Sequence, residues 1–145
     1  MAYGWAVGER ANTALALQAW QRAKSTFQEY DIPYVGMIIH HDRDAVFTSY
    51  DWTGQLLVKD HVRVSYALGG AKDNPEMESF TGRFKEENHS LFLDAQSLAE
   101  LAAIVDERMR YYNMERRHSA IDYQSPMTYF THVRWGLVKD LHRES

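Results

Sequence analysis

The apolar run Val35–Ile39 constrains the fold of this chain more than any other segment. The run is nearly continuous, which predicts a strand buried on both faces, as in a parallel or mixed sheet. Residues 62–66 alternate between apolar and polar side chains and predict a half-exposed strand, and Tyr3–Val7 is aromatic and β-branched enough for a short one. Helical patterns separate these segments, so the fold class is predicted to be α/β.

Capping residues predict where the helices begin. The predicted caps are Asn12 or Thr13, Thr48 or Ser49, Asn74 followed by Pro75, and Ser97 with Glu100 in capping-box spacing. The first helix carries the stripe Leu15, Ala19, Ala23 and Phe27 and ends near Pro33, and the second reaches about Asp60. The third places Met77, Phe80 and Phe84 toward the core, and the fourth is long and amphipathic. Residues 68–73 are predicted to be a loop, and the segment after Pro126 a helix or a loop.

Composition excludes several classes of protein. A chain of 145 residues with 45% apolar content suits one domain, and a formal charge of −4 means that any nucleic-acid binding must be local. The absence of cysteine excludes disulfides, thiolate metal sites and thiol nucleophiles. No apolar stretch approaches the roughly 20 residues that cross a bilayer, and no signal peptide is visible. We therefore expect a soluble cytoplasmic protein with no membrane partner.

Two carboxylates stand where a metal site is plausible on chemical grounds. Asp42 follows the predicted strand 35–39, at the edge of an α/β sheet where ligands usually bind. Glu78 shares one face of its predicted helix with Gly82 and Lys85. A carboxylate for Mg²⁺, a gap and a cation together suit a phosphodiester backbone. The competing interpretation is that both acids are common for local reasons, one after a strand and one in a first helical turn.

The segment 108–118 forms the one clear basic cluster in the sequence. Its members are Arg108, Arg110, Arg116 and Arg117, interleaved with Tyr111, Tyr112 and His118, against the single acid Glu115. The cluster could bind a nucleic-acid backbone. Alternatively, it is a positive helix C-terminus that complements the helix dipole.

The His40-His41-Asp42 sequence raises a further alternative. Adjacent His and Asp residues occur in HD-type phosphohydrolases, in which His41 would bind metal. The remaining histidines are scattered singly, so packing at the strand end or at the margin of the site is the simpler role for His40 and His41.

Taken in order along the chain, these motifs resemble a known family. They are His40-His41-Asp42-Arg43, Phe47-Thr48-Ser49, Asp73-Asn74, Met77-Glu78-Ser79-Phe80, Lys85, Tyr112-Asn113, Arg116, His118-Ser119, Tyr123 and Ser125-Pro126. The set resembles the retroviral-integrase-type catalytic core of bacterial insertion-sequence transposases, over roughly residues 3–130. Thirty-five residues separate Asp42 from Glu78, which is the family's spacing between its second Asp and its Glu.

The resemblance implies a ribonuclease-H-like fold and DNA strand transfer that uses Mg²⁺ or Mn²⁺ held by two Asp and one Glu. Asp42 is similar to the second metal-binding Asp, Glu78 to the Glu, and Lys85 to a DNA-contacting Lys. The family's first Asp has no counterpart, because no Asp precedes Asp31. The resemblance therefore implies a core that lacks its first two strands, with residues 1–130 a partial catalytic core and residues 131–145 a C-terminal tail.

Two smaller departures accompany the missing Asp. Tyr66–Gly70 stands where many relatives carry basic residues, and Asp44 replaces a usual Gly, where a turn role is expected. The main hypothesis is a DNA-integration catalytic-core fragment that is inactive alone. The alternative is a non-enzymatic module that binds nucleic acid or interacts with a transposase. The expected partners are DNA and either a full-length transposase or a second copy of the chain.

Overall fold

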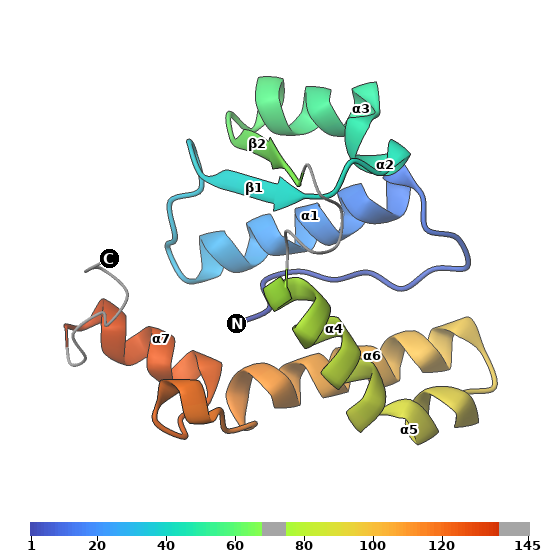
Figure 1. Cartoon of the computed structure of the whole chain (residues 1–145), viewed down its shortest axis with the longest axis vertical. Coiled ribbons are helices and arrows are strands. Elements are labelled where there is room, and N and C mark those ends of the chain that lie inside the picture. Colours follow the sequence, from blue (N-terminus) through green and yellow to red (C-terminus); the bar gives the residue numbers. More distant parts are fainter. Residues whose placement is uncertain (68–74, 137–145) are drawn as a thin grey trace. The chain divides into compact units, whose positions relative to one another are not determined.

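The computed structural model describes residues 1–67 and 75–136. The chain divides into two compact units. The sheet unit comprises residues 3–102, and the C-terminal unit comprises residues 1–2 and 103–145. The elements in chain order are α1 (Thr13–Glu29), β1 (Ile38–His41), α2 (Ala45–Thr48), α3 (Tyr50–Thr53), the π-helical segment η1 (Gly54–Lys59), β2 (Arg63–Tyr66), α4 (Pro75–Glu87), α5 (His89–Asp94), α6 (Leu98–Met114), the 3-10 turn Ser119–Ile121 and α7 (Pro126–Arg134) (Figure 1).

The sheet formed by the described residues has two parallel strands, β1 and β2 (Figure 1). Ile39 pairs with Val64 in the register, and both side chains pack on the core. Because side chains alternate along a strand, Ile38 points to the opposite face, where it is 54% exposed. The prediction that the first of these strands is buried on both faces is therefore wrong for the described residues: one face is covered and the other is open.

The start of the predicted strand 35–39 is a turn. Gly36 has a φ of 78°, and the N–H of Met37 donates to the carbonyl of Tyr34 at 3.0 Å. This is the geometry in which glycine is favoured at the third position of a turn. Val35 sits beside it and is 70% exposed, so the strand begins later than the apolar run does.

Helix α1 begins where its cap predicts. The side chain of Asn12 accepts a hydrogen bond from the N–H of Leu15 at 2.9 Å, which satisfies one of the free donors of the first turn. The buried residues of the helix are Trp20, Ala23 and Phe27. Ala23 and Phe27 of the predicted apolar stripe are thus confirmed as buried, whereas Trp20 is buried in place of the predicted Ala19.

The core of the sheet unit lies between α1 and the segment that links the two strands. Its buried members are Trp20, Ala23, Phe27, Trp52, Leu56 and Val62. Trp20 packs edge-on to Phe27 with ring centroids 6.1 Å apart. Leu56, on η1, is completely buried, so the linking segment is held by the same apolar contacts as α1.

Residues Tyr3–Val7 do not form the predicted strand; they have no regular secondary structure and no strand partner among the described residues. The carbonyl of Tyr3 instead accepts from the hydroxyl of Thr26 at 2.8 Å. The ring of Tyr3 lies 5.1 Å from that of Phe27. The segment is thus held against α1 by side-chain contacts, and β propensity was not sufficient to make it a strand.

The connection from β1 to β2 is helical, as predicted. Ser49 caps α3 by accepting from the N–H of Trp52 at 3.3 Å, with Asp51 in the first turn. The helix continues as η1 as far as Lys59, one residue before the predicted end at Asp60. A short extra helix, α2, precedes it and is capped by Asp44, which confirms a local turn role for that acid.

Helix α4 begins at Pro75, as predicted, and runs to Glu87. Phe84 is buried, with its ring 5.8 Å from Phe80 and 5.7 Å from Phe92 of α5. Met77 was predicted on the core side and is instead 56% exposed. The predicted cap Asn74 and the predicted loop 68–73 lie outside the described residues.

Helix α6 has the cap bond of the predicted capping box, whereas the returning bond from Glu100 goes to Gln96 and not to Ser97. The N–H of Glu100 donates to the hydroxyl of Ser97 at 3.1 Å, and the Glu100 carboxylate accepts from the N–H of Gln96 at 2.8 Å. Further along, in the C-terminal unit, the amide of Asn113 exchanges two hydrogen bonds of 2.8 Å with the backbone of Ala2. Ser125 caps α7, so the segment after Pro126 is a helix. Mixed helix and strand, the predicted class, is confirmed.

Candidate metal site and nucleic-acid surface

Asp42 lies directly after β1, at the carboxyl end of the parallel strands. Its side chain is exposed, and its Oδ1 atom accepts from the N–H of Asp44 at 3.1 Å. Asp44 in turn accepts from the N–H of Val46 at 2.9 Å and so starts α2. This chain of local bonds holds the Asp42 loop in shape and leaves a carboxylate facing solvent.

Glu78, Gly82 and Lys85 are all exposed on α4, on a face distinct from that of the buried Phe84. A Cβ added at Gly82 would meet nothing within 4 Å, so the gap between the acid and the cation is open. Glu78 lies in the first turn of the helix and Lys85 in the last. The predicted face of acid, gap and cation is therefore accessible to a ligand.

In the sequence, Asp42 comes before residues 68–74 and Glu78 comes after them. That the two carboxylates bind one metal ion together stays a prediction. Within residues 1–67 and 75–136, no three His, Asp or Glu side chains are grouped closely enough to hold a metal ion. Oxygen donors of this kind are nevertheless what Mg²⁺ uses, and it commonly takes one or two carboxylates and keeps several waters. Two exposed carboxylates thus fit one such ion in donor type and number.

The ring of His41 is buried next to Asp42, with 8% exposure. Its Nδ1–H donates to the carbonyl of Asp42 at 3.0 Å, and its Nε2 accepts from the indole N–H of Trp52 at 3.1 Å. Burial lowers the pKa of His41 and outweighs the opposing effect of the bond to Asp42. Both ring nitrogens are occupied and the ring is neutral, so the HD-type alternative, in which His41 binds metal, is not supported. His40 is exposed and its Nδ1 lies 3.1 Å from the Ser65 hydroxyl.

The basic cluster 108–118 lies in the C-terminal unit, and part of it is engaged in local contacts. The guanidinium of Arg108 lies over the ring of Tyr111, 4.4 Å from its centroid. Arg116 donates to Nδ1 of His118 at 3.0 Å, and the His118 ring stacks edge-on to Tyr112 at 4.9 Å. These contacts connect the side chains that follow α6 to residues of its last turns.

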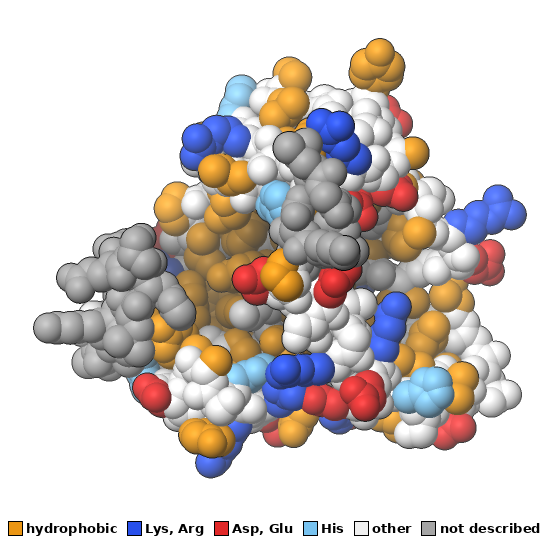
Figure 2. Space-filling model, viewed as in Figure 1, with side chains coloured by type: hydrophobic (Ala, Val, Ile, Leu, Met, Phe, Trp, Pro, Cys, Tyr) orange, Lys and Arg blue, Asp and Glu red, His pale blue; other side chains and the backbone are white. Residues whose placement is uncertain are grey.

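Arg110 and Arg117 are the exposed arginines of that cluster. The last turn of α6 contains no basic residue, because Arg110 lies before it and Arg117 after it. Arg116 and Arg117 lie two and three residues beyond the helix end at Met114, where positive charge still complements the dipole, so the helix-dipole alternative stays open. On the face drawn in Figure 2, basic and acidic side chains are interspersed over the described surface. This agrees with the expectation that any nucleic-acid binding is confined to a local patch.

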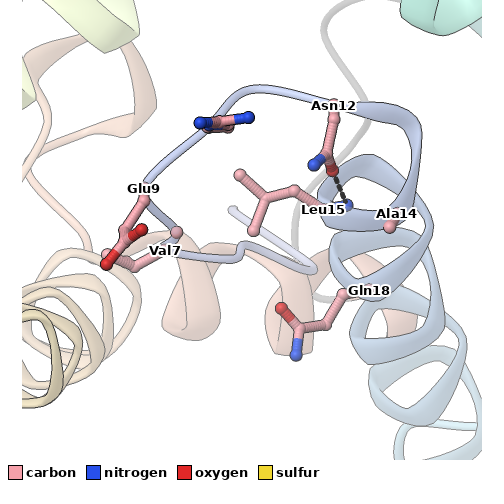
Figure 3. Close-up of a pocket in the computed structure, with 8 residues that line it drawn as sticks. Val7, Glu9, Asn12, Ala14, Leu15 and Gln18 are labelled. Carbon is pink, nitrogen blue, oxygen red and sulfur yellow. Dashed lines mark hydrogen bonds between the residues drawn. The ribbon is translucent and has the colours of Figure 1, made fainter.

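A hollow of about 500 Å³ lies beside the start of α1 (Figure 3). Its lining mixes apolar Val7 and Leu15 with Glu9 and Gln18. The side chain of Asn12 points to the helix and is used as its cap. The lining contains none of the site residues predicted from sequence.

Sequence reasoning missed one buried polar cluster in the sheet unit. The carboxylate of Asp60 accepts from the indole N–H of Trp20 at 2.7 Å, from Lys24 at 2.9 and 3.1 Å, and from Gln55 at 3.0 Å. Burial raises the pKa of Asp60, but these hydrogen bonds and the Lys24 charge lower it by more, so the net shift is downward. No local signal predicts this pairing, because Lys24 and Asp60 are far apart in the chain.

Comparison with known proteins agrees with the resemblance seen in the motifs. The family model for the integrase core domain matches residues 62–126, a range that contains Glu78, Lys85 and the basic cluster. The chain is 29% identical over 126 residues to the transposase for insertion sequence element IS904 of Lactococcus lactis subsp. lactis (strain IL1403), covering 85% of this chain and 47% of that protein. It is 29% identical over 126 residues to the insertion element IS600 uncharacterized 31 kDa protein of Shigella sonnei, covering 86% and 44%.

These matches agree with the order of the motifs: residues 62–126 are similar to the integrase core domain, and the chain is similar to proteins of two insertion elements. The predicted resemblance is confirmed. The chain spans less than half the length of the curated relatives it matches. No helix in the described parts of the chain is long and apolar enough to span a membrane.

Proposed function

We propose that this chain supplies part of the catalytic core of a DNA transposase, a metal-dependent strand-transfer enzyme with a ribonuclease-H-like fold. The observation that carries the proposal is the coincidence of three features: an integrase core match over 62–126, an exposed Asp42 at the carboxyl end of β1, and an exposed Glu78 on α4. A DNA substrate also fits the predicted cytoplasmic location.

Asp42 and Glu78 would hold the divalent ion, Mg²⁺ or Mn²⁺. When bound, the ion supplies Lewis-acid stabilisation of phosphodiester oxygens. The residues of the chain position the metal-binding carboxylate and leave space for DNA. The bond from the Asp44 N–H fixes one oxygen of Asp42, and the open side of Gly82 leaves room for a strand beside Glu78. Lys85 would pair with a phosphate on that face.

Arg110 and Arg117 would provide a DNA contact of the C-terminal unit, taken by itself. Both are exposed and carry charges that phosphates can neutralise. Arg108, Arg116 and His118 would support them through the ring contacts of that segment. Such contacts position DNA without reading its sequence.

Mn²⁺ titration of the ¹⁵N-labelled chain tests the proposed ion site. A paramagnetic ion broadens the amide signals close to it, so weak binding can be detected and located. We expect the Asp42 loop and the start of α4 to broaden together. Asp42→Asn and Glu78→Gln should each remove the broadening at both places, because one ion is shared. Broadening that each variant removes only at its own position would mean two separate weak sites and would contradict the proposal.

Two exposed acids provide matched controls. Asp51→Asn, in the first turn of α3, removes an exposed carboxylate from the segment that links β1 to β2, and Glu86→Gln removes one from α4, the helix of Glu78. Both should leave the broadening unchanged. A loss in either control would show a general charge effect.

The assigned carboxylates are two of the three that the family resemblance implies, so we expect no strand transfer from the 145 residues by themselves. Fusing the first two strands and the Asp of an integrase core ahead of Tyr3 should tighten Mn²⁺ binding. If the fused protein folds and binds no more tightly, the assignment of Asp42 and Glu78 is wrong.

A non-enzymatic role is the second candidate, and it would use the same exposed Arg110 and Arg117. A module that binds DNA or a full-length transposase would show DNA binding that weakens steeply with salt, or capture of the transposase, without any Mn²⁺ broadening. That pattern would decide for the module against the enzyme core.

A further inference from the structure

Three aromatic rings and two hydrogen bonds surround the ring of His41. It stacks on Phe47 with centroids 4.6 Å apart, and the rings of Tyr66 and Trp52 meet it edge-on at 4.8 and 5.8 Å. The hydroxyl of Tyr66 donates to the carbonyl of Phe47 at 3.0 Å, which ties two of these residues to each other. The ring therefore has little freedom to rotate.

The Trp52 indole also selects the tautomer of His41. An indole N–H can only donate, so the Nε2 atom that it contacts must carry a free lone pair. The proton of the neutral ring is thereby on Nδ1, where it donates to the carbonyl of Asp42. A carbonyl can only accept, so both hydrogen bonds agree on one state.

From this geometry we propose that His41 is a positioning residue that holds the Asp42 backbone, and through it the Asp42 carboxylate, in the orientation that binds the divalent ion. The inference rests on the proposed metal role of Asp42. The backbone of Asp42 is held on one side by the His41 ring, and its side chain is held on the other by the Asp44 N–H. Groups that orient a metal-binding residue commonly change metal affinity when they are removed.

Two substitutions separate the hydrogen bond from the packing of the ring. His41→Phe keeps an aromatic ring among its neighbours and loses the donor to Asp42. His41→Asn loses the ring and keeps an N–H close to the position of Nδ1. We expect His41→Phe to weaken Mn²⁺ binding at Asp42 by about tenfold, the lower end of the range for such orienting groups. We expect His41→Asn to restore most of that loss.

A stability control excludes a general loosening of the core. Val62 is buried in the core cluster that contains Trp52, a neighbour of His41, and Val62→Ala should lower the stability without changing Mn²⁺ affinity. Unchanged affinity in His41→Phe, or equal weakening in His41→Phe and His41→Asn, would overturn the positioning role. Weakening in Val62→Ala of the same size would overturn it as well.

The ¹⁵N resonances of the His41 ring make failure of this inference distinct from failure of the proposed function. They should show a proton on Nδ1 and a bare Nε2 without any metal present, and a proton on Nε2 would refute the geometry directly. If the ring is in the expected tautomer and neither the parent nor Asp42→Asn responds to Mn²⁺, the metal role of Asp42 fails, and the positioning role falls with it. If the parent responds and Asp42→Asn does not, only the His41 variants decide the inference.

Discussion

Replacing Asp60 with alanine should remove a large part of the stability of the sheet unit. The carboxylate is 8% exposed, and the ammonium group of Lys24, 2.9 Å away, belongs to a side chain that is 12% exposed. The substitution leaves three donors without their acceptor, on Trp20, Lys24 and Gln55. Breaking a buried ion pair by removing one partner costs about 3–5 kcal/mol. Lys24 can recover water by extending outward, so we expect the lower part of this range.

That loss can be measured by urea unfolding followed through far-UV circular dichroism and tryptophan fluorescence. Trp20 contacts Asp60 directly, so the two signals should report one transition if the unit unfolds cooperatively. Against a total of about 5–15 kcal/mol for a domain of ordinary stability, a loss of about 3 kcal/mol should lower the urea midpoint clearly.

Two comparison variants make the reasoning refutable. Asp51→Ala removes an exposed acid from a helix first turn and should cost at most about 1 kcal/mol. The double variant Lys24→Met with Asp60→Ala should be less destabilised than the sum of the single changes, because neither charge is left alone. A cost for Asp60→Ala no larger than that for Asp51→Ala would refute the argument that the cluster stabilises the fold.

Three further predictions follow from individual residues. The pKa of Asp60 in the folded state lies below its ordinary value of 3.8. Its contribution to the free energy of unfolding is therefore present above pH 3.8 and is lost as the pH falls through the folded-state pKa. Unfolding measured at a series of acidic pH values should show this loss of stability, and the Asp60→Ala variant should not show it. A Cβ at Gly4 would lie 2.5 Å from the backbone nitrogen of Ala23, so Gly4→Ala should cost about 1–3 kcal/mol in the same urea assay; an unchanged midpoint would contradict this close approach. Arg110→Ala and Arg117→Ala should each weaken duplex DNA binding and reduce the slope of log affinity against log salt by about 1; an unchanged slope would remove that residue from the contact.

The site was predictable in part because its residues depend on local rules. Asp42 follows a strand that the apolar run predicts, and Glu78 follows a helix start that Pro75 predicts, so their placement after β1 and on α4 needed no tertiary information. Both carboxylates are exposed, and their role as metal ligands stays a prediction. Whether they meet depends on how the segments on either side of residues 68–74 come together, and sequence spacing alone cannot determine that.

Helix starts were determined by the sequence itself. Asn12, Ser49 and Ser125 cap their helices through hydrogen bonds within three residues, and such bonds form wherever the chain folds. Strand formation was not determined in the same way. Tyr3–Val7 has the composition of a strand, but a strand needs a partner, and this segment packs on α1 instead.

Contacts between distant residues were decided only by the tertiary structure. From the sequence, Asp60 is compatible with a solvated acid at the end of a helix. In the folded chain it is buried and bonded to the indole of Trp20 and to Lys24. His41 could have been a metal ligand, and the fold gives its two nitrogens to Trp52 and to the Asp42 backbone. The physical reason is the same in both cases: the charge state and the hydrogen bonds of a buried polar group depend on the neighbours that enclose it, and those neighbours come from other parts of the chain.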